Sequence, residues 1–294
     1  MLKAVILGSG AAIPTKERGL SSVGLRFAGR VYLFDCGEGT QRQMMRFGMS
    51  FAKVDSIFVS HSHADHIVGI AGLAQTLDLS GRREPLRIFC PKGAAGDVEA
   101  LLSIGKYGYP AVVSEIGEGA VLEGNGFSVK AFQVAHSRPS LGFVFEEEGR
   151  RNFDEKKCAA LGIKGRMFGE LEAKGEIRVG GKTVKYESVS TAKRGAKFAY
   201  SGDCVPGKGT VAAARGAHVL VHEATYASDK EEEAREHLHS TAAQAAAVAK
   251  KAGAGRLVLT HISGRYKTPE LHLLDARKVF PETVAAEDGM ELVF

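Results

Sequence analysis

The chain has 294 residues, of which 44% are hydrophobic and 25% are charged. This composition is that of an ordinary globular protein and excludes a disordered or low-complexity chain. No apolar stretch approaches the ~18 residues that a membrane-spanning helix needs, so we expect no membrane partner. The formal net charge of +5 is too small to name a partner by itself.

The first half of the chain alternates strand-like and helix-like segments. Short β-rich runs predict strands over residues 3–7, 22–27, 31–35 and 54–60. Apolar spacing predicts a short helix over 40–48 and a longer one over 65–77. Strands interleaved with helices are typical of a layered α/β fold.

The second half repeats this pattern and adds polar residues at strand ends. Strands are predicted over 127–134, 198–201, 219–222 and 257–260, and helices over 241–252 and 269–279. Ser240 or Thr241 is the expected N-cap of the helix over 241–252. The last three strands run into Asp203, Glu223 and His261. Because binding and catalytic residues are often on loops at one edge of a sheet, we expect the chemistry at these strand ends.

The four cysteines are scattered and contain no CxxC pair. The chain opens with a strand-like segment rather than a secretory leader. These features predict a cytoplasmic protein with reduced thiols.

Basic residues are concentrated in one segment with weak periodicity. From residue 150 to 185 there are ten Lys or Arg against five Asp or Glu, an excess equal to the net charge of the whole chain. Such a segment could hold a polyanion, although charge alone favours an ordinary solvated loop. We interpret residues 146–184 as an insertion in a single domain over 1–294.

The strongest chemical signal follows the strand predicted over 54–60. His61, His63, Asp65 and His66 place three imidazoles and one carboxylate within six residues. Zn²⁺ prefers nitrogen-rich shells completed by oxygen, and catalytic sites leave a coordination position open. A structural zinc site or a polar loop is the alternative, but structural sites are usually rich in thiolates, and the cysteines lie elsewhere.

Three isolated residues follow other predicted strands and could complete a site for two ions. They are His136, Asp203 and His261. Each of them alone would be a weak signal, since a single histidine is more often a structural residue than a ligand.

Together, the HSHADH segment, the later histidine, SGD and THIS resemble the metallo-β-lactamase superfamily. The resemblance implies an αββα sandwich with two mixed sheets and outer helices. It also implies one zinc bound by His61, His63 and His136, a second bound by Asp65, His66 and His261, and Asp203 as the bridge between them. Mn²⁺ or Fe²⁺ in place of Zn²⁺ stays open.

Further motifs are similar to those of the tRNase Z (ribonuclease Z) family over nearly the full length. They are DCGEGTQ at 35–41, HEAT at 222–225, HST at 239–241, ISGRYK at 262–267 and PTKER at 14–18. The segment over 161–169 resembles the family's tRNA-binding arm. Carried over by this resemblance, the expected substrate-binding residues are Lys16, Arg18, Lys164, Arg166 and His222.

The resemblance implies an endonuclease that removes the 3′ trailer from precursor tRNA. Two metal ions can activate water near neutral pH and neutralise the phosphodiester. Asp65 would orient or deprotonate that water, and His239, oriented by Glu223, would protonate the leaving 3′ oxygen. The products would be a tRNA with a 3′-OH and a trailer with a 5′-phosphate. A homodimer is implied by the resemblance alone.

Two other functions stay open at this point. Another hydrolase with the same metal site, such as a phosphodiesterase for small molecules, would share the ligands but would need no basic arm. An RNA-binding protein that contains zinc without catalysis would not need Glu223 and His239.

Overall fold

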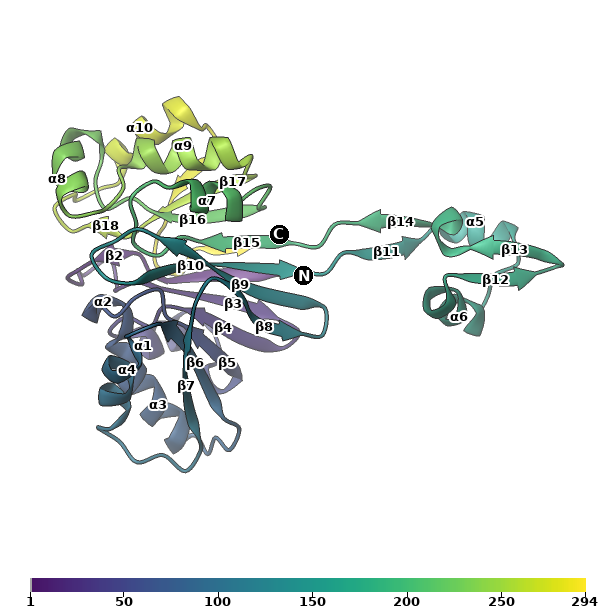
Figure 1. Ribbon diagram of the computed structural model, residues 1–294, viewed down its shortest axis with the longest axis horizontal. Coiled ribbons are helices and arrows are strands. Elements are labelled where there is room, and N and C mark those ends of the chain that lie inside the picture. Colours follow the sequence, from purple (N-terminus) through teal and green to yellow (C-terminus); the bar gives the residue numbers. More distant parts are fainter. Residues whose placement is uncertain (1) are drawn as a thin grey trace. The chain divides into compact units, whose positions relative to one another are not determined.

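The structure is a computed structural model that describes residues 2–294 and contains two compact units. Unit 1 comprises the chain up to Glu146 and the segment from Lys197 to Phe294. Unit 2 comprises residues Glu147–Ala196. Figure 1 labels the elements of both units.

Unit 1 is built on two seven-stranded mixed sheets. The first contains, in spatial order, β20 (Glu291–Val293), β1 (Lys3–Gly8), β3 (Ser22–Phe27), β4 (Arg30–Phe34), β5 (Val54–Phe58), β6 (Leu86–Pro91) and β7 (Ala111–Ile116). The second contains β19 (Thr283–Ala285), β17 (Arg256–Thr260), β16 (Val219–Glu223), β15 (Lys197–Tyr200), β10 (Ser140–Glu147), β9 (Phe127–Val134) and β8 (Gly119–Gly124). A short parallel pair, β2 (Gly10–Ala11) and β18 (Ile262–Ser263), links the two halves of the chain.

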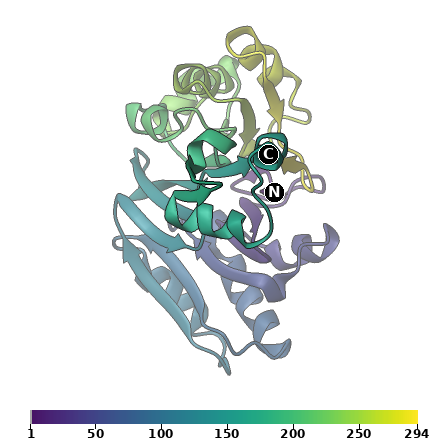
Figure 2. The same ribbon diagram turned by 90° about the vertical axis from the view of Figure 1, so that its right-hand side faces the viewer.

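Helices cover the outer face of each sheet, as Figures 1 and 2 show. The first sheet carries α1 (Thr40–Arg46), α2 (Ala64–Ile67), α3 (Gly69–Leu79) and α4 (Ala95–Leu102). The second carries α7 (Lys208–Ala213), α8 (Glu231–Glu236), α9 (Ala242–Ala252) and α10 (Glu270–Val279). The predicted αββα arrangement is therefore confirmed.

Aromatic side chains fill the space between the two sheets. Phe34 of β4 lies 5.3 Å from Phe198 of β15, measured between ring centroids, and Phe58 of β5 lies 5.5 Å from Phe143 of β10. All four rings are fully buried. Because large apolar side chains from both sheets meet here, burial of apolar area stabilises the sandwich.

The helix predicted over residues 65–77 is divided into α2 and α3, with Val68 between them. The backbone N–H of Gly69 donates to the Cys36 carbonyl at 2.9 Å instead of continuing the helical ladder. A Cβ at Gly69 would lie 1.9 Å from the Gly37 carbonyl oxygen, so only glycine permits this approach. The division positions α2, which carries Asp65 and His66, against the Cys36–Gly37 segment.

Unit 2 has a small core of its own. It contains β11 (Arg150–Phe153) paired with β14 (Ser190–Lys193), β12 (Glu176–Val179) paired with β13 (Lys182–Lys185), and the helices α5 (Glu155–Ala160) and α6 (Arg166–Lys174). Its hydrophobic core consists of Cys158, Ile163, Leu171, Ile177, Val184 and Val189. Because β14 pairs with β11, the unit continues to Ala196, beyond the segment of weak periodicity over 146–184.

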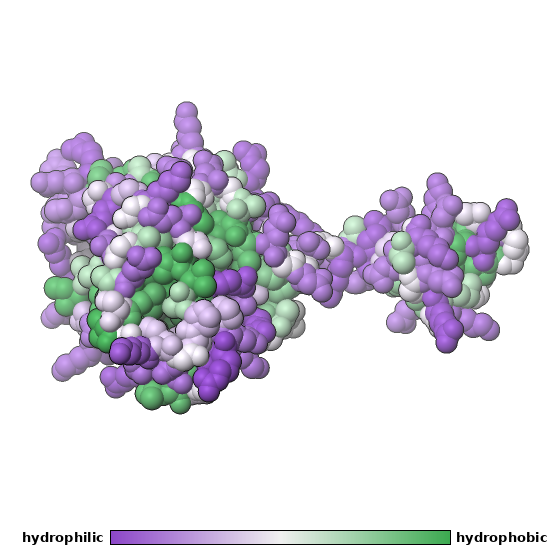
Figure 3. Space-filling view, turned by 60° about the horizontal axis from the view of Figure 1, so that its bottom comes forward, coloured by the Kyte–Doolittle hydropathy of each residue, from purple (hydrophilic) through white to green (hydrophobic). Residues whose placement is uncertain are grey.

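Unit 2 is rich in charged residues. Residues 147–196 include 12 Lys or Arg and 8 Asp or Glu, which give a net charge of +4. Hydrophilic side chains cover most of the face of this unit that Figure 3 draws.

Within residues 2–294, each helix is too short or too polar to cross a membrane.

Candidate metal centre

The predicted ligands converge at one end of the two sheets of unit 1, from the loops after β5, β9, β15 and β17 and from α2. Donor atoms of His61, His63, His136 and Asp203 lie within 4.8 Å of one another, and so do those of Asp65, His66 and His261. The structure thus gathers all seven predicted ligand residues.

The first group is made of three ring nitrogens and one carboxylate. Nδ1 of His63 lies 3.0 Å from Nε2 of His61 and 3.4 Å from Nε2 of His136. Oδ2 of Asp203 lies 3.7 Å from Nε2 of His61. Donor atoms bound at ~2.0–2.2 Å around a tetrahedral ion are roughly 3.3–3.6 Å apart. This spacing fits one metal ion at the centre of the group.

The second group shares the same oxygen of Asp203. Oδ2 of Asp203 lies 3.3 Å from Nε2 of His66 and 3.2 Å from Nε2 of His261. Oδ2 of Asp65 lies 3.6 and 3.3 Å from the same two nitrogens. Nε2 of His66 is buried and makes no hydrogen bond within the described residues, which is unusual for an imidazole nitrogen unless it faces an ion. The donor set therefore fits a second metal ion, with Asp203 between the two sites.

Hydrogen bonds at the far side of each ring aim the ligand nitrogens inward. The Nδ1–H of His61 donates to Ser60 Oγ at 3.0 Å, and Ser60 Oγ in turn donates to the Asp35 carboxylate at 2.8 Å. His66 Nδ1–H donates to Asp35 at 2.7 Å. Such partners fix the tautomer and raise the basicity of the ligating nitrogen. This leaves Nε2 of both rings free to serve as a ligand atom.

Hydrogen bonds at Nδ1 orient the rings of His261 and His136 in the same way, so that Nε2 of each ring faces the candidate metal site. His261 Nδ1–H donates to Thr225 Oγ1 at 2.8 Å, and His136 Nδ1–H donates to the Leu238 carbonyl at 2.9 Å. His261 and Leu238 both have positive φ angles, 56° and 58°. Non-glycine residues in this region are strained, and such strain persists where the surrounding structure requires it. His63 is the exception, since its Nδ1 faces the group and its Nε2 lies 3.4 Å from Ser137 Oγ.

Asp35 is a candidate functional residue that was not among the predicted site residues. Its buried carboxylate accepts from the Ser60 N–H at 2.6 Å, from the Tyr200 hydroxyl at 2.7 Å and from the partners described above. Its φ of 59° turns the chain into the glycine-rich segment that follows. The DCGEGTQ resemblance was the only signal for it.

Burial and mutual contact set the protonation of the ligands. Burial lowers the pKa of His61, His63 and His136, which keeps these rings neutral near pH 7, as metal binding requires. Burial raises the pKa of Asp203, but His261 and His66 outweigh this and hold it well below its usual range. Burial lowers the pKa of His66, but Asp203 and Asp35 together raise it well above its usual range. Ionised carboxylates therefore face the second group of donor atoms, and a bound cation would neutralise their negative charge.

A second polar pair lies beside the ligands. His239 Nδ1–H donates to Glu223 Oε1 at 2.9 Å, and the His239 ring centroid lies 4.9 Å from that of His136. Glu223 is buried and also accepts from Thr225 and from the backbone N–H groups of Cys204 and Ser240. Burial lowers the pKa of His239, but Glu223 outweighs it and raises the pKa to about 9. The geometry can thus present a protonated imidazole at the edge of the site.

The predicted substrate-binding residues lie in different surroundings. Lys16 is exposed on the loop after β2, whereas the Arg18 guanidinium turns inward and donates to Ser9 Oγ at 2.7 Å and to the Ala286 carbonyl at 2.6 Å. His222 is fully buried and donates to the Glu223 carbonyl at 2.7 Å. The structure thus places His222 in a buried position beside Glu223 rather than on the surface.

The remaining two, Lys164 and Arg166, are exposed in unit 2 at the start of α6.

Similar proteins identify the family. Residues 30–153 and 166–262 match the family described as the beta-lactamase superfamily domain. A protein named ribonuclease Z from Methanosarcina acetivorans is 43% identical over 298 residues, which cover 99% of this chain and 98% of that protein. The ribonuclease Z of Methanothermobacter thermautotrophicus is 42% identical over 99% of this chain and 96% of its own length. The chain belongs to the ribonuclease Z family.

Solved structures agree with this membership. The human tRNase Z, short form, has a TM-score of 0.71 and 30% sequence identity, and the match covers 99% of this chain and 98% of that one. The metallo-beta-lactamase fold protein YhfI from Bacillus subtilis has a TM-score of 0.72 at 18% identity, which shows a common fold alone. Both resemblances drawn from the sequence, to the superfamily and to the ribonuclease Z family within it, are confirmed.

Proposed function

We propose that this chain is a metal-dependent endoribonuclease that removes the 3′ trailer from precursor tRNA. The observation that carries the proposal is the conjunction of two convergent ligand groups with the Glu223–His239 pair beside them. The relatives named ribonuclease Z, at about 42–43% identity over almost the whole chain, support the substrate class.

The ligand set favours two Zn²⁺ ions per chain, with Mn²⁺ or Fe²⁺ as alternatives. His61, His63 and His136 would hold one ion, and Asp65, His66 and His261 the other, with Asp203 shared. Bound divalent cations supply Lewis-acid polarisation of the phosphate and a water of lowered pKa.

Two side chains of the protein would move the protons of the reaction. As the water oxygen bonds to phosphorus, Asp65 accepts the proton that the water loses. As the bond from phosphorus to the 3′ oxygen breaks, His239 donates a proton to that oxygen. The electron pair of the broken bond stays on the 3′ oxygen, so the products are a tRNA 3′-OH and a trailer with a 5′-phosphate. Glu223 keeps the His239 ring oriented by its hydrogen bond at 2.9 Å.

Unit 2 would serve as the tRNA-binding arm inserted in a single metallo-β-lactamase domain. Its net charge of +4 and the exposed side chains of Lys164 and Arg166 suit contacts with phosphates. Lys16 would lie near the RNA end at the catalytic unit. A cytoplasmic homodimer completes the proposal, and the four unpaired cysteines agree with a reducing compartment.

Cleavage of a 3′-extended precursor tRNA tests the proposal. The purified protein, its Asp65→Ala variant and a Glu123→Ala control on the exposed face of β8 are incubated with the RNA, with and without a chelator. We expect cleavage near the acceptor end by the wild type and the control, and none by Asp65→Ala or after chelation. Metal-loaded protein that hydrolyses only a small phosphodiester would leave the fold assignment intact and refute the tRNA substrate.

A further inference from the structure

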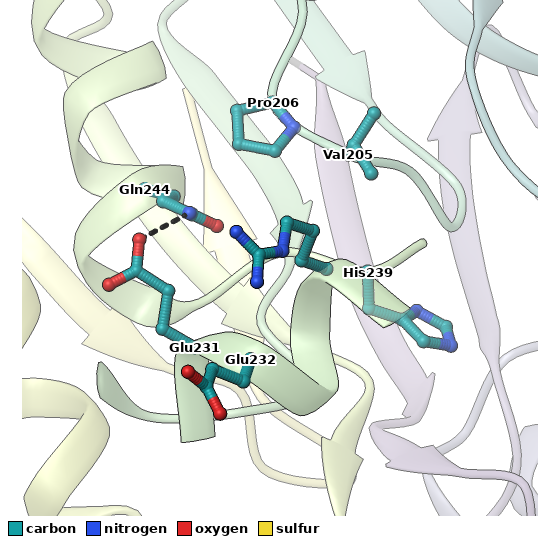
Figure 4. A pocket seen from close by; sticks show the side chains of 7 residues that line it. Val205, Pro206, Glu231, Glu232, His239 and Gln244 are labelled. Atoms are coloured by element: carbon teal, nitrogen blue, oxygen red, sulfur yellow. Dashed lines mark hydrogen bonds between the residues drawn. The ribbon is translucent and has the colours of Figure 1, made fainter. Parts of the chain in front are cut away.

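A pocket of about 340 Å³ opens next to His239. Its wall is formed by Val205 and Pro206 after β15, by Glu231, Glu232 and Arg235 of α8, and by Gln244 of α9. Figure 4 shows His239 at one end, with Val205 and Pro206 on one side and Glu231 and Glu232 on the opposite side. The volume is at the lower end of those of small-ligand sites, which suits a single nucleoside rather than a duplex.

The charges around this pocket disfavour a phosphate group. Glu231 and Glu232 place two carboxylates on its wall against the single guanidinium of Arg235. Glu231 is held at the wall by Gln244, whose Nε2 donates to it at 3.2 Å. Carboxylates repel a phosphate and accept hydrogen bonds from neutral donors, such as the amino and imino groups of a nucleobase.

The other wall groups suit the flat face of a base. Proteins that bind unpaired RNA bases stack them on aromatic rings, on imidazoles and on arginine guanidinium planes. His239 is held in place by Glu223, with 14% of its side chain exposed, and Arg235 is exposed on α8. Val205 and Pro206 add an apolar surface opposite the carboxylates.

The bond that breaks, between phosphorus and the 3′ oxygen, determines which nucleotide lies next to the pocket. This step rests on the proposed function, in which His239 protonates the departing 3′ oxygen. That oxygen belongs to the ribose on the 5′ side of the cut, so this ribose must lie against His239. We propose that the pocket beside His239 receives the base of the nucleotide immediately 5′ of the cleaved bond. In precursor tRNA this is the last nucleotide of the product tRNA.

Two changes, one in the RNA and one in the protein, test the proposal together. Precursor tRNAs carry a single abasic residue either directly 5′ of the cut or directly 3′ of it, and kcat/KM is measured for the wild type and for Arg235→Ala. Arg256→Ala is the charge-matched control, because Arg256 is exposed at the start of β17, at the opposite end of that strand from His261. Circular dichroism and thermal unfolding check that each variant is folded.

We expect the 5′ abasic residue to lower kcat/KM of the wild type about tenfold, the usual scale for removing one stacked base. Arg235→Ala should show a similar decrease on the normal RNA and little more on the 5′ abasic RNA, because both changes remove the same interaction. The 3′ abasic residue should affect the wild type and Arg235→Ala equally, and Arg256→Ala should behave as the wild type throughout.

Other outcomes separate the two proposals. If the wild type cuts precursor tRNA and the effects of Arg235→Ala and the 5′ abasic residue multiply, the base does not occupy this pocket and only the present inference fails. The same holds if the 5′ abasic residue has no effect on the wild type. If the wild type does not cut precursor tRNA at all, the proposed function fails and this inference fails with it.

Discussion

Asp35 and His66 are joined by a hydrogen bond of 2.7 Å between the Asp35 carboxylate and Nδ1 of His66, and both side chains are fully buried. Asp35 directly follows β4, and His66 lies in α2, which comes after β5 in the chain. The bond leaves Nε2 of His66 as the atom that faces the second ligand group. A metal site that depends on this orientation should be sensitive to a residue that is not itself a ligand.

We predict that Asp35→Asn weakens metal binding about 10- to 100-fold, the range found for partners of ligating histidines. The neutral amide is a poorer acceptor for His66 Nδ1–H and for Ser60 Oγ, so two ligand rings lose their orientation. Competition with a chromophoric chelator measures the affinity. Tyr200→Phe is the matched comparison, since it removes only one donor to Asp35 and should have a smaller effect. An Asp35→Asn affinity within twofold of the wild type would contradict the prediction.

We predict that His239→Ala lowers kcat by about 10²- to 10⁴-fold, the contribution typical of a general acid. Glu223→Gln should lower kcat less, because the ring remains but loses its charged partner. The metal content of both variants, measured by atomic emission, should stay at the wild-type level. The double variant should be no worse than His239→Ala alone, because Glu223 acts through His239. Independent, multiplying effects would show that Glu223 has a separate role.

We predict that removing the metal lowers the thermal stability of the protein. The six other candidate ligand side chains then remain crowded around Asp203, whereas a bound ion stabilises the folded state by mass action. Differential scanning calorimetry with and without a chelator measures the change in Tm. The variant His61→Ala should respond less to the chelator than the wild type, since it has lost one ligand. Equal Tm values for the loaded and chelated wild type would argue against metal at this site.

We predict that Lys164→Ala with Arg166→Ala weakens binding of precursor tRNA and makes the salt dependence of binding shallower. Removal of one phosphate-binding side chain should reduce the slope of log K against log salt by about 0.7 to 0.9. Hydrolysis of a small phosphodiester should be unchanged, because these residues lie in unit 2 and the ligands in unit 1. The control is Lys53→Ala with Arg256→Ala, two exposed positions, the first directly before β5 and the second at the start of β17. An equally large decrease in binding by the control would mean that net charge, not unit 2, holds the RNA.

Local sequence patterns predicted much of unit 1. The strands β3 and β9 have the predicted bounds, and Thr241, one of two candidates, is the N-cap of α9 with its side chain accepting from Gln244 N. These features follow from the alternation of apolar residues and from hydrogen bonds within four residues. The predictions were less accurate where residues distant in the sequence interact. The hydrogen bond from Gly69 to Cys36 divides the helix that was expected over 65–77.

The family and the candidate ligand residues could be predicted from the sequence alone, because the HSHADH spacing and the other motifs are local and can be read along the chain. Which atoms of these residues face one another depends on the folded arrangement of distant segments. His261 reaches Asp65 across 196 positions, and His63 presents Nδ1 while its neighbour His61 presents Nε2. The hydrogen bonds of Asp35 to Ser60, His66 and Tyr200 and the pocket beside His239 likewise arise from contacts between distant segments. The reason is physical: side-chain orientation depends on hydrogen bonds and packing between segments that only the order of the strands brings together.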